Sequence, residues 1–99
     1  MSDIQPSNDY IIENIDNILE DICKNYEQYG LEENKINIHD LALLLKKSFI
    51  LYEIPITINS KRRSVLTYLK KKHKGLLSYI KKRTQFKIDR TTTDVWILL

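Results

Sequence analysis

The feature that most constrains the fold is the regular spacing of apolar residues near the N-terminus. Between Asp9 and Tyr29 these residues recur at intervals of three and four: Ile11, Ile15, Ile18, Ile22, Tyr26 and Tyr29. This spacing matches the period of an α-helix and places the side chains on one face. Ser7 or Asn8 can cap the start, and Gly30 suits the left-handed residue that ends a helix. We therefore predict an amphipathic helix over residues 9–29.

The middle of the chain predicts a strand followed by a second helix. Ile36-Asn37-Ile38 alternates as a short strand does, and Asp40 then opens an apolar helical stretch from Leu41 to about Phe49 or Tyr52. Pro55 excludes a helix across residues 53–55, because proline lacks a backbone donor and pushes its predecessor into extended conformation. We expect a loop or brief strand there.

The last forty residues predict two more helices and a hairpin. The third helix runs from Lys61 to about His73, capped by Asn59 or Ser60. Gly75 interrupts it, and a fourth helix from Leu76 ends in Lys81-Lys82-Arg83. Residues 86–88 and 95–99 flank a polar turn at 89–94, as in a β-hairpin.

This order of elements predicts a mainly α fold with a small β-hairpin, of the α+β class. We expect a winged-helix-like helical bundle whose C-terminal hairpin is the wing. Residues 1–8 are expected to be a flexible N-terminal arm, and residues 9–99 a single winged-helix-like domain. The composition, with 42% hydrophobic residues, two Gly and two Pro, is typical of a folded domain and not of a disordered tail.

The charges of the chain are strongly segregated. Residues 1–45 hold 2 basic and 10 acidic residues, whereas residues 46–99 hold 14 basic and 3 acidic residues, and the balances of −8 and +11 sum to +3. Eleven Lys and Arg and no Asp or Glu lie between Ile54 and Ile88. Such a block attracts polyanions. Its members repel one another, so the stability of the fold gives no reason for the chain to carry them.

This block is the predicted nucleic-acid-binding site, contacting phosphates through a basic helix and the wing. Its members are Lys61, Arg62, Arg63, Lys70, Lys71, Lys72, Lys74, Lys81, Lys82, Arg83 and Lys87. Tyr68 and Tyr79 lie within it and could stack on bases, although core packing with a wet hydroxyl is the favoured interpretation. A merely solvated surface is the alternative for the cations.

Catalysis is not expected, because the sequence lacks a phosphate-binding loop, a metalloprotease motif and a nucleophile elbow. His39 and His73 are expected in capping or surface roles, and Cys23 as a packed or half-exposed thiol. No metal, cofactor or small-molecule substrate is predicted. The acidic first twenty residues do not resemble a signal peptide and no run is long enough to span a bilayer, so we expect no membrane and an intracellular location, cytoplasmic or nuclear.

The acidic first helix leaves a second function open. Its outer face carries Asp16, Glu20, Asp21 and Glu27. It can pair with the basic half, orient the module by repelling nucleic acid, or dock a protein partner. The alternative function is therefore a protein-interaction adaptor or a dimerisation module, with another protein or a second copy bound through this helix or through an apolar face of the winged helix.

The segment Gly75–Ile88, GLLSYIKKRTQFKI, followed by Val95-Trp96-Ile97, resembles the end of a LOTUS domain, also called an OST-type helix-turn-helix. Residues 36–41, INIHDL, are similar to that family's strand-into-helix entry. The chain departs from the family at residues 61–74, where we expect a long basic helix in place of a shorter connection. The resemblance implies a winged helix that binds RNA, favoured over DNA, or that docks on an RNA helicase.

Overall fold

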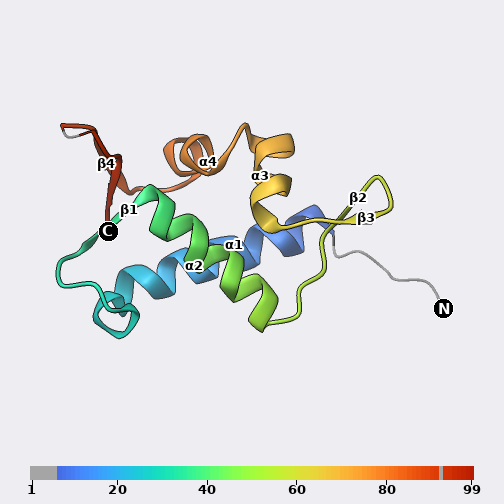
Figure 1. Ribbon diagram of the computed structural model, residues 1–99, viewed down its shortest axis with the longest axis horizontal. Coiled ribbons are helices and arrows are strands. Elements are labelled where there is room, and N and C mark those ends of the chain that lie inside the picture. The colour runs from blue at the N-terminus through green and yellow to red at the C-terminus, as the bar shows by residue number, and fades with distance from the viewer. Residues whose placement is uncertain (1–6, 92) are drawn as a thin grey trace.

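The computed structural model describes residues 7–91 and 93–99, and helices form most of this part of the chain (Figure 1). In chain order the elements are α1 (Asn8–Lys24), the 3-10 helix η1 (Tyr26–Tyr29), β1 (Lys35–Asn37), α2 (Ile38–Leu51), β2 (Thr57–Ile58), β3 (Lys61–Arg62), α3 (Val65–His73), α4 (Leu76–Arg83), β4 (Lys87–Asp89) and β5 (Trp96–Leu98). The expected α+β class is confirmed as a mainly helical fold with a small antiparallel sheet.

Helix α1 begins where its capping residue predicts. The Ser7 hydroxyl accepts a hydrogen bond from the Tyr10 backbone N–H, which satisfies one of the free donors of the first turn. Residues 1–6 of the expected arm lie outside the described residues, and Asn8 already belongs to the helix. The predicted C-terminal end was wrong, because the α-helix ends at Lys24 and the chain tightens into η1. Gly30, with φ 81°, closes η1 in the left-handed region.

The core joins all four α-helices to the sheet. Helix α1 buries five apolar residues, and α2, α3 and α4 bury three each. The buried residues are Ile11, Ile15, Ile18, Leu19, Ile22, Ile36, Leu41, Leu45, Phe49, Ile54, Ile56, Val65, Tyr68, Leu69, Leu76, Tyr79, Ile80 and Ile97. Since they come from every part of the described chain, helices and sheet share one core.

Strand β1 runs directly into α2, as the sequence predicts, but the helix begins earlier than expected. Asn37 and not Asp40 is the cap, and its side-chain oxygen accepts from the His39 backbone N–H. Asp40 lies in the first turn, where a carboxylate interacts favourably with the positive end of the helix dipole. The expected end of this helix at residues 49–52 is confirmed at Leu51.

The predicted third helix over residues 61–73 was wrong in its first turn. Strands β2 and β3 form a small antiparallel hairpin instead, with Thr57 opposite Arg62 and Ile58 opposite Lys61. Its turn residues Asn59 and Ser60 both have positive φ, 53° and 63°, which an α-helix does not allow. Helix α3 therefore starts only at Val65, capped by the Ser64 hydroxyl, which accepts from the Thr67 backbone N–H.

Helices α3 and α4 are joined by a two-residue turn, Lys74-Gly75. Lys74 has φ 62°, and the Gly75 N–H donates to the Leu69 carbonyl, as at a left-handed helix end. Gly75 has φ 108° and ψ 167°, a conformation that almost only glycine adopts. The turn therefore depends on glycine at position 75 and brings the C-terminal end of α3 next to the start of α4.

The C-terminal hairpin is confirmed and is part of a three-stranded sheet of order β1-β5-β4. Ile97 on the central strand lies opposite Ile36 of β1 on one side and Ile88 of β4 on the other. It is fully buried. The sheet therefore ties the end of the chain to the segment before α2. No helix within residues 7–91 or 93–99 is long and apolar enough to cross a bilayer.

Candidate nucleic-acid interface

The eleven predicted cations are all exposed. Lys61 and Arg62 form β3, and Arg63 follows it. Lys70, Lys71 and Lys72 form the last turn of α3, and Lys74 is its cap. Lys81, Lys82 and Arg83 form the last turn of α4, and Lys87 begins β4. The clusters therefore come from four consecutive elements, whereas we expected the first two clusters on one helix over residues 61–73.

These four elements follow one another along the long axis of the molecule. Figure 1 shows β3 near one end, then α3, then α4, and β4 toward the other end. The molecule measures 48 Å along this axis and 26 and 20 Å across it. Helix α1, which carries Asp9, Glu13, Asp16, Glu20 and Asp21, runs below α3 and α4 in the same view. The basic elements are therefore arranged in a row along the long axis of the molecule.

Two of the basic clusters have a local stabilising role that was not predicted from the sequence. Lysine and arginine in the last turn of α3 and α4 lie at the negative end of each helix dipole. Each such charge contributes about 0.3–1 kcal/mol when exposed. Lys61, Arg62 and Arg63 lie outside any helix and lack this compensation. Charge on the short strand β3 does protect an open sheet edge from pairing with other chains.

None of the eleven cations forms an ion pair with a carboxylate in the described part of the chain. The ion pairs found there join Lys24 to Glu20 at 2.8 Å and Lys35 to Glu33 at 3.2 Å, both in the acidic half. Glu20 raises the pKa of Lys24 through the hydrogen bond and its charge. The exposed cations of α3, α4 and the two hairpins are thus left without a direct counter-charge among described residues.

Arg83 is the member of the block that faces the acidic helix. Its guanidinium carbon lies 5.7 Å from the centroid of the Tyr79 ring. The residue also lines a surface cavity together with Asp16 and Glu20 of α1. Its charge is therefore partly offset by nearby carboxylates, and we separate it from the other ten cations.

The acidic residues of α1 are largely engaged within the chain. Asp16 accepts a hydrogen bond from the hydroxyl of Tyr79, and Asp21 accepts from Tyr29 and from the Asn25 amide. The bond to Asp21 raises the pKa of Tyr29 to about 12. These contacts hold α1 to α4 and to η1, so part of the acidic surface serves the fold.

Tyr68 and Tyr79 pack in the core, as the favoured interpretation predicts, and are too buried to stack on bases. They are 2% and 0% exposed. The Tyr68 hydroxyl donates to Asn8 at 2.9 Å, and that of Tyr79 donates to Asp16. Burial is the main cause that raises the pKa of both phenols. Their role is therefore to join α3 and α4 to α1.

His73 is half-buried and its ring packs against both tyrosines, a contact that the expected capping or surface role did not include. Its ring centroid is 6.2 Å from that of Tyr68 and 5.0 Å from that of Tyr79, edge-on to the latter. Burial, with a smaller effect of the Arg83 and Lys82 charges, lowers the pKa of His73 below its ordinary value of 6.5. His39, by contrast, is exposed in the first turn of α2.

The lowered pKa of His73 predicts a loss of stability in mild acid. As the pH falls through 6.5, the unfolded chain binds a proton at His73 that the folded protein resists, so the free energy of unfolding decreases. His73→Gln should flatten this decrease between about pH 7.5 and 5.5, measured by urea unfolding at several pH values. His39→Gln is the matched control and should keep the pH dependence of the native protein. An equal slope in His73→Gln and the native protein would contradict the prediction.

Three exposed cations near the basic elements were missing from the predicted site. Lys46 and Lys47 lie on α2, which packs against α3, and Arg90 lies in the turn of the C-terminal hairpin. All three are in the basic half of the sequence, but they fall outside the acid-free interval that defined the prediction. They become candidates for the basic surface because α2 packs against α3 and because Arg90 directly follows β4.

The structure assembles no metal-ligand cluster among the residues that it describes, where no three His, Cys, Asp or Glu side chains come together. Cys23 is half-buried and lines the same cavity as Arg83. No family model, curated protein or solved structure matches the chain.

Proposed function

We propose that the protein is a non-catalytic nucleic-acid-binding module that contacts phosphates through β3, α3, α4 and the hairpin of β4 and β5. The observation that carries this proposal is the row of exposed cations with no ion-paired carboxylate among the described residues. A phosphate backbone offers regularly spaced negative charges to such a row. The preference for RNA over DNA rests on the resemblance of residues 75–97 to LOTUS domains.

A winged-helix arrangement is part of this proposal. The order of α1, β1, α2, α3, α4, β4 and β5, and the sheet order β1-β5-β4, support it. Helices α3 and α4 and their tight turn act as the helix-turn-helix, and the hairpin of β4 and β5 acts as the wing. Lys81 and Lys82 at the end of α4 and Arg90 in the wing then bind the same backbone.

The conformation of Lys74 also supports the proposal. The residue after α3 needs a left-handed backbone, for which Gly and Asn are the usual choices. A lysine with φ 62° is strained there by about 1 kcal/mol. Strained residues often mark functional sites. A phosphate contact would explain why a lysine occupies this position in spite of the backbone strain.

Lys74→Gly separates binding from stability. We expect the free energy of unfolding to rise by about 0.5–1 kcal/mol, because glycine adopts the left-handed region without strain. Nucleic-acid affinity should fall several-fold, and the slope of log affinity against log salt should become shallower by about 0.9. Lys71→Gly is the matched control: it removes one cation too, but costs about 1 kcal/mol as a glycine inside a helix. A Lys74→Gly variant with unchanged affinity would remove Lys74 from the site.

The proposal is tested by measuring binding of single-stranded RNA, double-stranded RNA and DNA over a series of salt concentrations. With about five phosphate contacts, log affinity for a duplex should fall by roughly 4–5 units per tenfold rise in salt. RNA should bind more tightly than DNA of the same sequence. Roughly tens of micromolar protein covers the range of dissociation constants for weak non-specific binding. Absence of binding to all three probes at low salt and this protein concentration would refute the proposal.

A further inference from the structure

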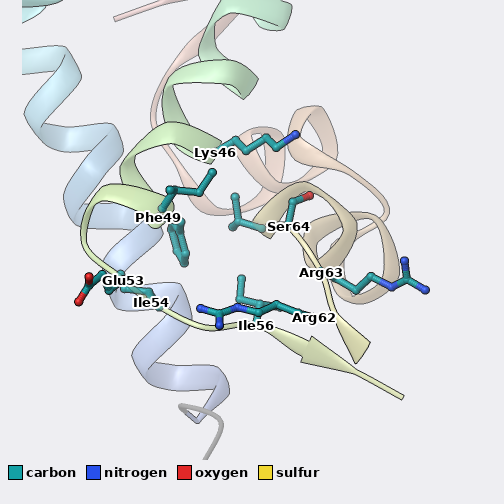
Figure 2. A pocket seen from close by; sticks show the side chains of 10 residues that line it. Lys46, Phe49, Glu53, Ile54, Ile56, Arg62, Arg63 and Ser64 are labelled. Carbon is teal, nitrogen blue, oxygen red and sulfur yellow. The ribbon is translucent and has the colours of Figure 1, made fainter. Parts of the chain in front are cut away.

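A second surface at the end of α2 has a different character from the basic row. A cavity of about 400 Å³ lies between the last turns of α2, the segment 53–56 and the junction of β3 with α3 (Figure 2). Its apolar lining includes Phe49, Ile56 and Val65, which are almost fully buried. Its volume is within the range of pockets that take up ligand groups.

Exposed apolar side chains are concentrated beside this cavity. Ile50 lines it and is 68% exposed, and Leu51 and Tyr52 follow at 75% and 59%. Leu43 lies two helical turns before Ile50, on the same side of α2. The remaining exposed large apolar residue in the described chain is Tyr10 on α1. Clustered exposure of this kind marks an interaction surface, whereas scattered exposure needs no explanation.

The rim of the cavity is positively charged. Lys46, Arg62 and Arg63 line it, and Figure 2 shows Lys46 and Arg63 extending outward while Phe49 projects inward. The single carboxylate of the lining, on Glu53, points away from the cavity in the same view. An apolar floor inside a cationic rim is complementary to a ligand that carries both large apolar groups and negative charge.

We propose that this cavity and the adjoining face of α2 bind an acidic peptide segment that inserts large apolar side chains. Its apolar residues would fill the cavity and cover Ile50, and its carboxylates would lie against Lys46, Arg62 and Arg63. A nucleic-acid backbone satisfies the rim but brings no aliphatic side chain to the floor. A bilayer surface is flat and does not fill a concave site. This site goes beyond the proposed function, and no residue of the acidic helix α1 lines it.

Binding of three short labelled peptides, followed by fluorescence anisotropy, tests this proposal. The first peptide has Glu at most positions and Phe or Leu at i, i+4 and i+7; the second replaces these apolar residues by Ser; the third replaces Glu by Lys. We expect only the first peptide to bind. Equal binding of the serine peptide would overturn the proposal, because charge alone would then be sufficient, and so would a lack of binding of the first peptide at ~1 mM.

Two variants with matched controls locate the site. Ile50→Ser and Arg62→Glu should each weaken binding of the first peptide about tenfold or more, and both positions are exposed, so folding is preserved. The controls are Tyr10→Ser, which replaces an exposed apolar side chain on α1, and Lys71→Glu, which reverses an exposed charge on α3. Both should leave peptide affinity unchanged. Equal effects of variants and controls on peptide affinity would overturn the proposal. It would also be overturned if the first peptide does not bind and the protein instead floats with phosphatidylserine vesicles in a way that depends on Ile50.

Nucleic-acid affinity distinguishes this proposal from the proposed function. Ile50→Ser removes no charge and should leave RNA binding unchanged while it weakens peptide binding. If RNA does not bind but the first peptide does, the proposed function fails and the peptide site stands. If RNA displaces the peptide and Ile50→Ser binds the peptide as tightly as the unchanged protein does, the peptide uses only the cations that RNA uses. The peptide proposal then fails.

Discussion

Replacing Lys70, Lys71, Lys72, Lys81 and Lys82 together by glutamine should abolish measurable nucleic-acid binding at physiological salt. Each phosphate contact contributes about 0.9 to the slope of log affinity against log salt, so the slope should decrease by roughly 4–5 units. At ~0.1 M salt this corresponds to a loss of affinity of at least about 100-fold. All five side chains are exposed on α3 and α4, and glutamine retains their helix propensity. Circular dichroism should therefore show a folded protein, and urea unfolding should show the loss of the stabilisation that these charges give to the two helix ends.

A second set of neutralised cations is the control for this variant. Lys24 and Lys35 lie in the acidic half and already pair with Glu20 and Glu33. Lys24→Gln with Lys35→Gln should leave nucleic-acid affinity and its salt slope almost unchanged. If this pair of changes weakens binding as much per charge as the five changes on α3 and α4, binding depends on net charge and no defined surface exists.

Tyr79→Ala should cause the largest loss of stability of any single change discussed here. The ring is 0% exposed and packs between α1 and α4, and His73 contacts it edge-on. Truncating a buried aromatic side chain to alanine costs about 3–5 kcal/mol, out of a total of about 5–15 kcal/mol for a domain of this size. We therefore expect partial unfolding at 37 °C, which thermal and urea denaturation will measure.

Two further tyrosine variants separate the ring from its hydroxyl. Tyr79→Phe keeps the ring and removes the hydrogen bond to Asp16, which should cost about 1–2 kcal/mol. Tyr10→Ala removes a ring that is 49% exposed on α1 and should change stability by no more than about 0.5 kcal/mol. A loss in Tyr79→Ala no greater than that in Tyr10→Ala would contradict the assignment of Tyr79 to the core.

The first turn of the predicted third helix shows why local patterns were insufficient. Lys61, Arg62 and Arg63 have good helix propensity, and a helix cap before them was a reasonable expectation. The hairpin forms because its ends are held elsewhere: the Arg63 N–H donates to the Ile56 carbonyl, and Ile56 is buried in the core. Tertiary packing of one isoleucine therefore overrides the propensity of the residues beside it.

The candidate site was predicted in part. The acid-free interval named eleven cations that are all exposed, because charged side chains are rarely buried without a partner. It omitted Lys46, Lys47 and Arg90, and it included Arg83, which lies beside Asp16. The cavity near Phe49 and Ile56 was not predicted. Its lining comes from α2, the segment after it and the β3–α3 junction, and no spacing in the sequence indicates that these meet.

The amino-acid sequence by itself determined that four helices and a C-terminal hairpin form and which apolar faces of the helices are buried, because apolar periodicity depends on neighbours one or two turns away. Only the tertiary structure decided which faces meet. The pairing of Ile36 with Ile97 and the bond from Tyr79 to Asp16, 63 residues away, join distant parts of the chain. Such contacts depend on the shapes and charges of whole surfaces, and these determine where the cations lie and where a cavity opens.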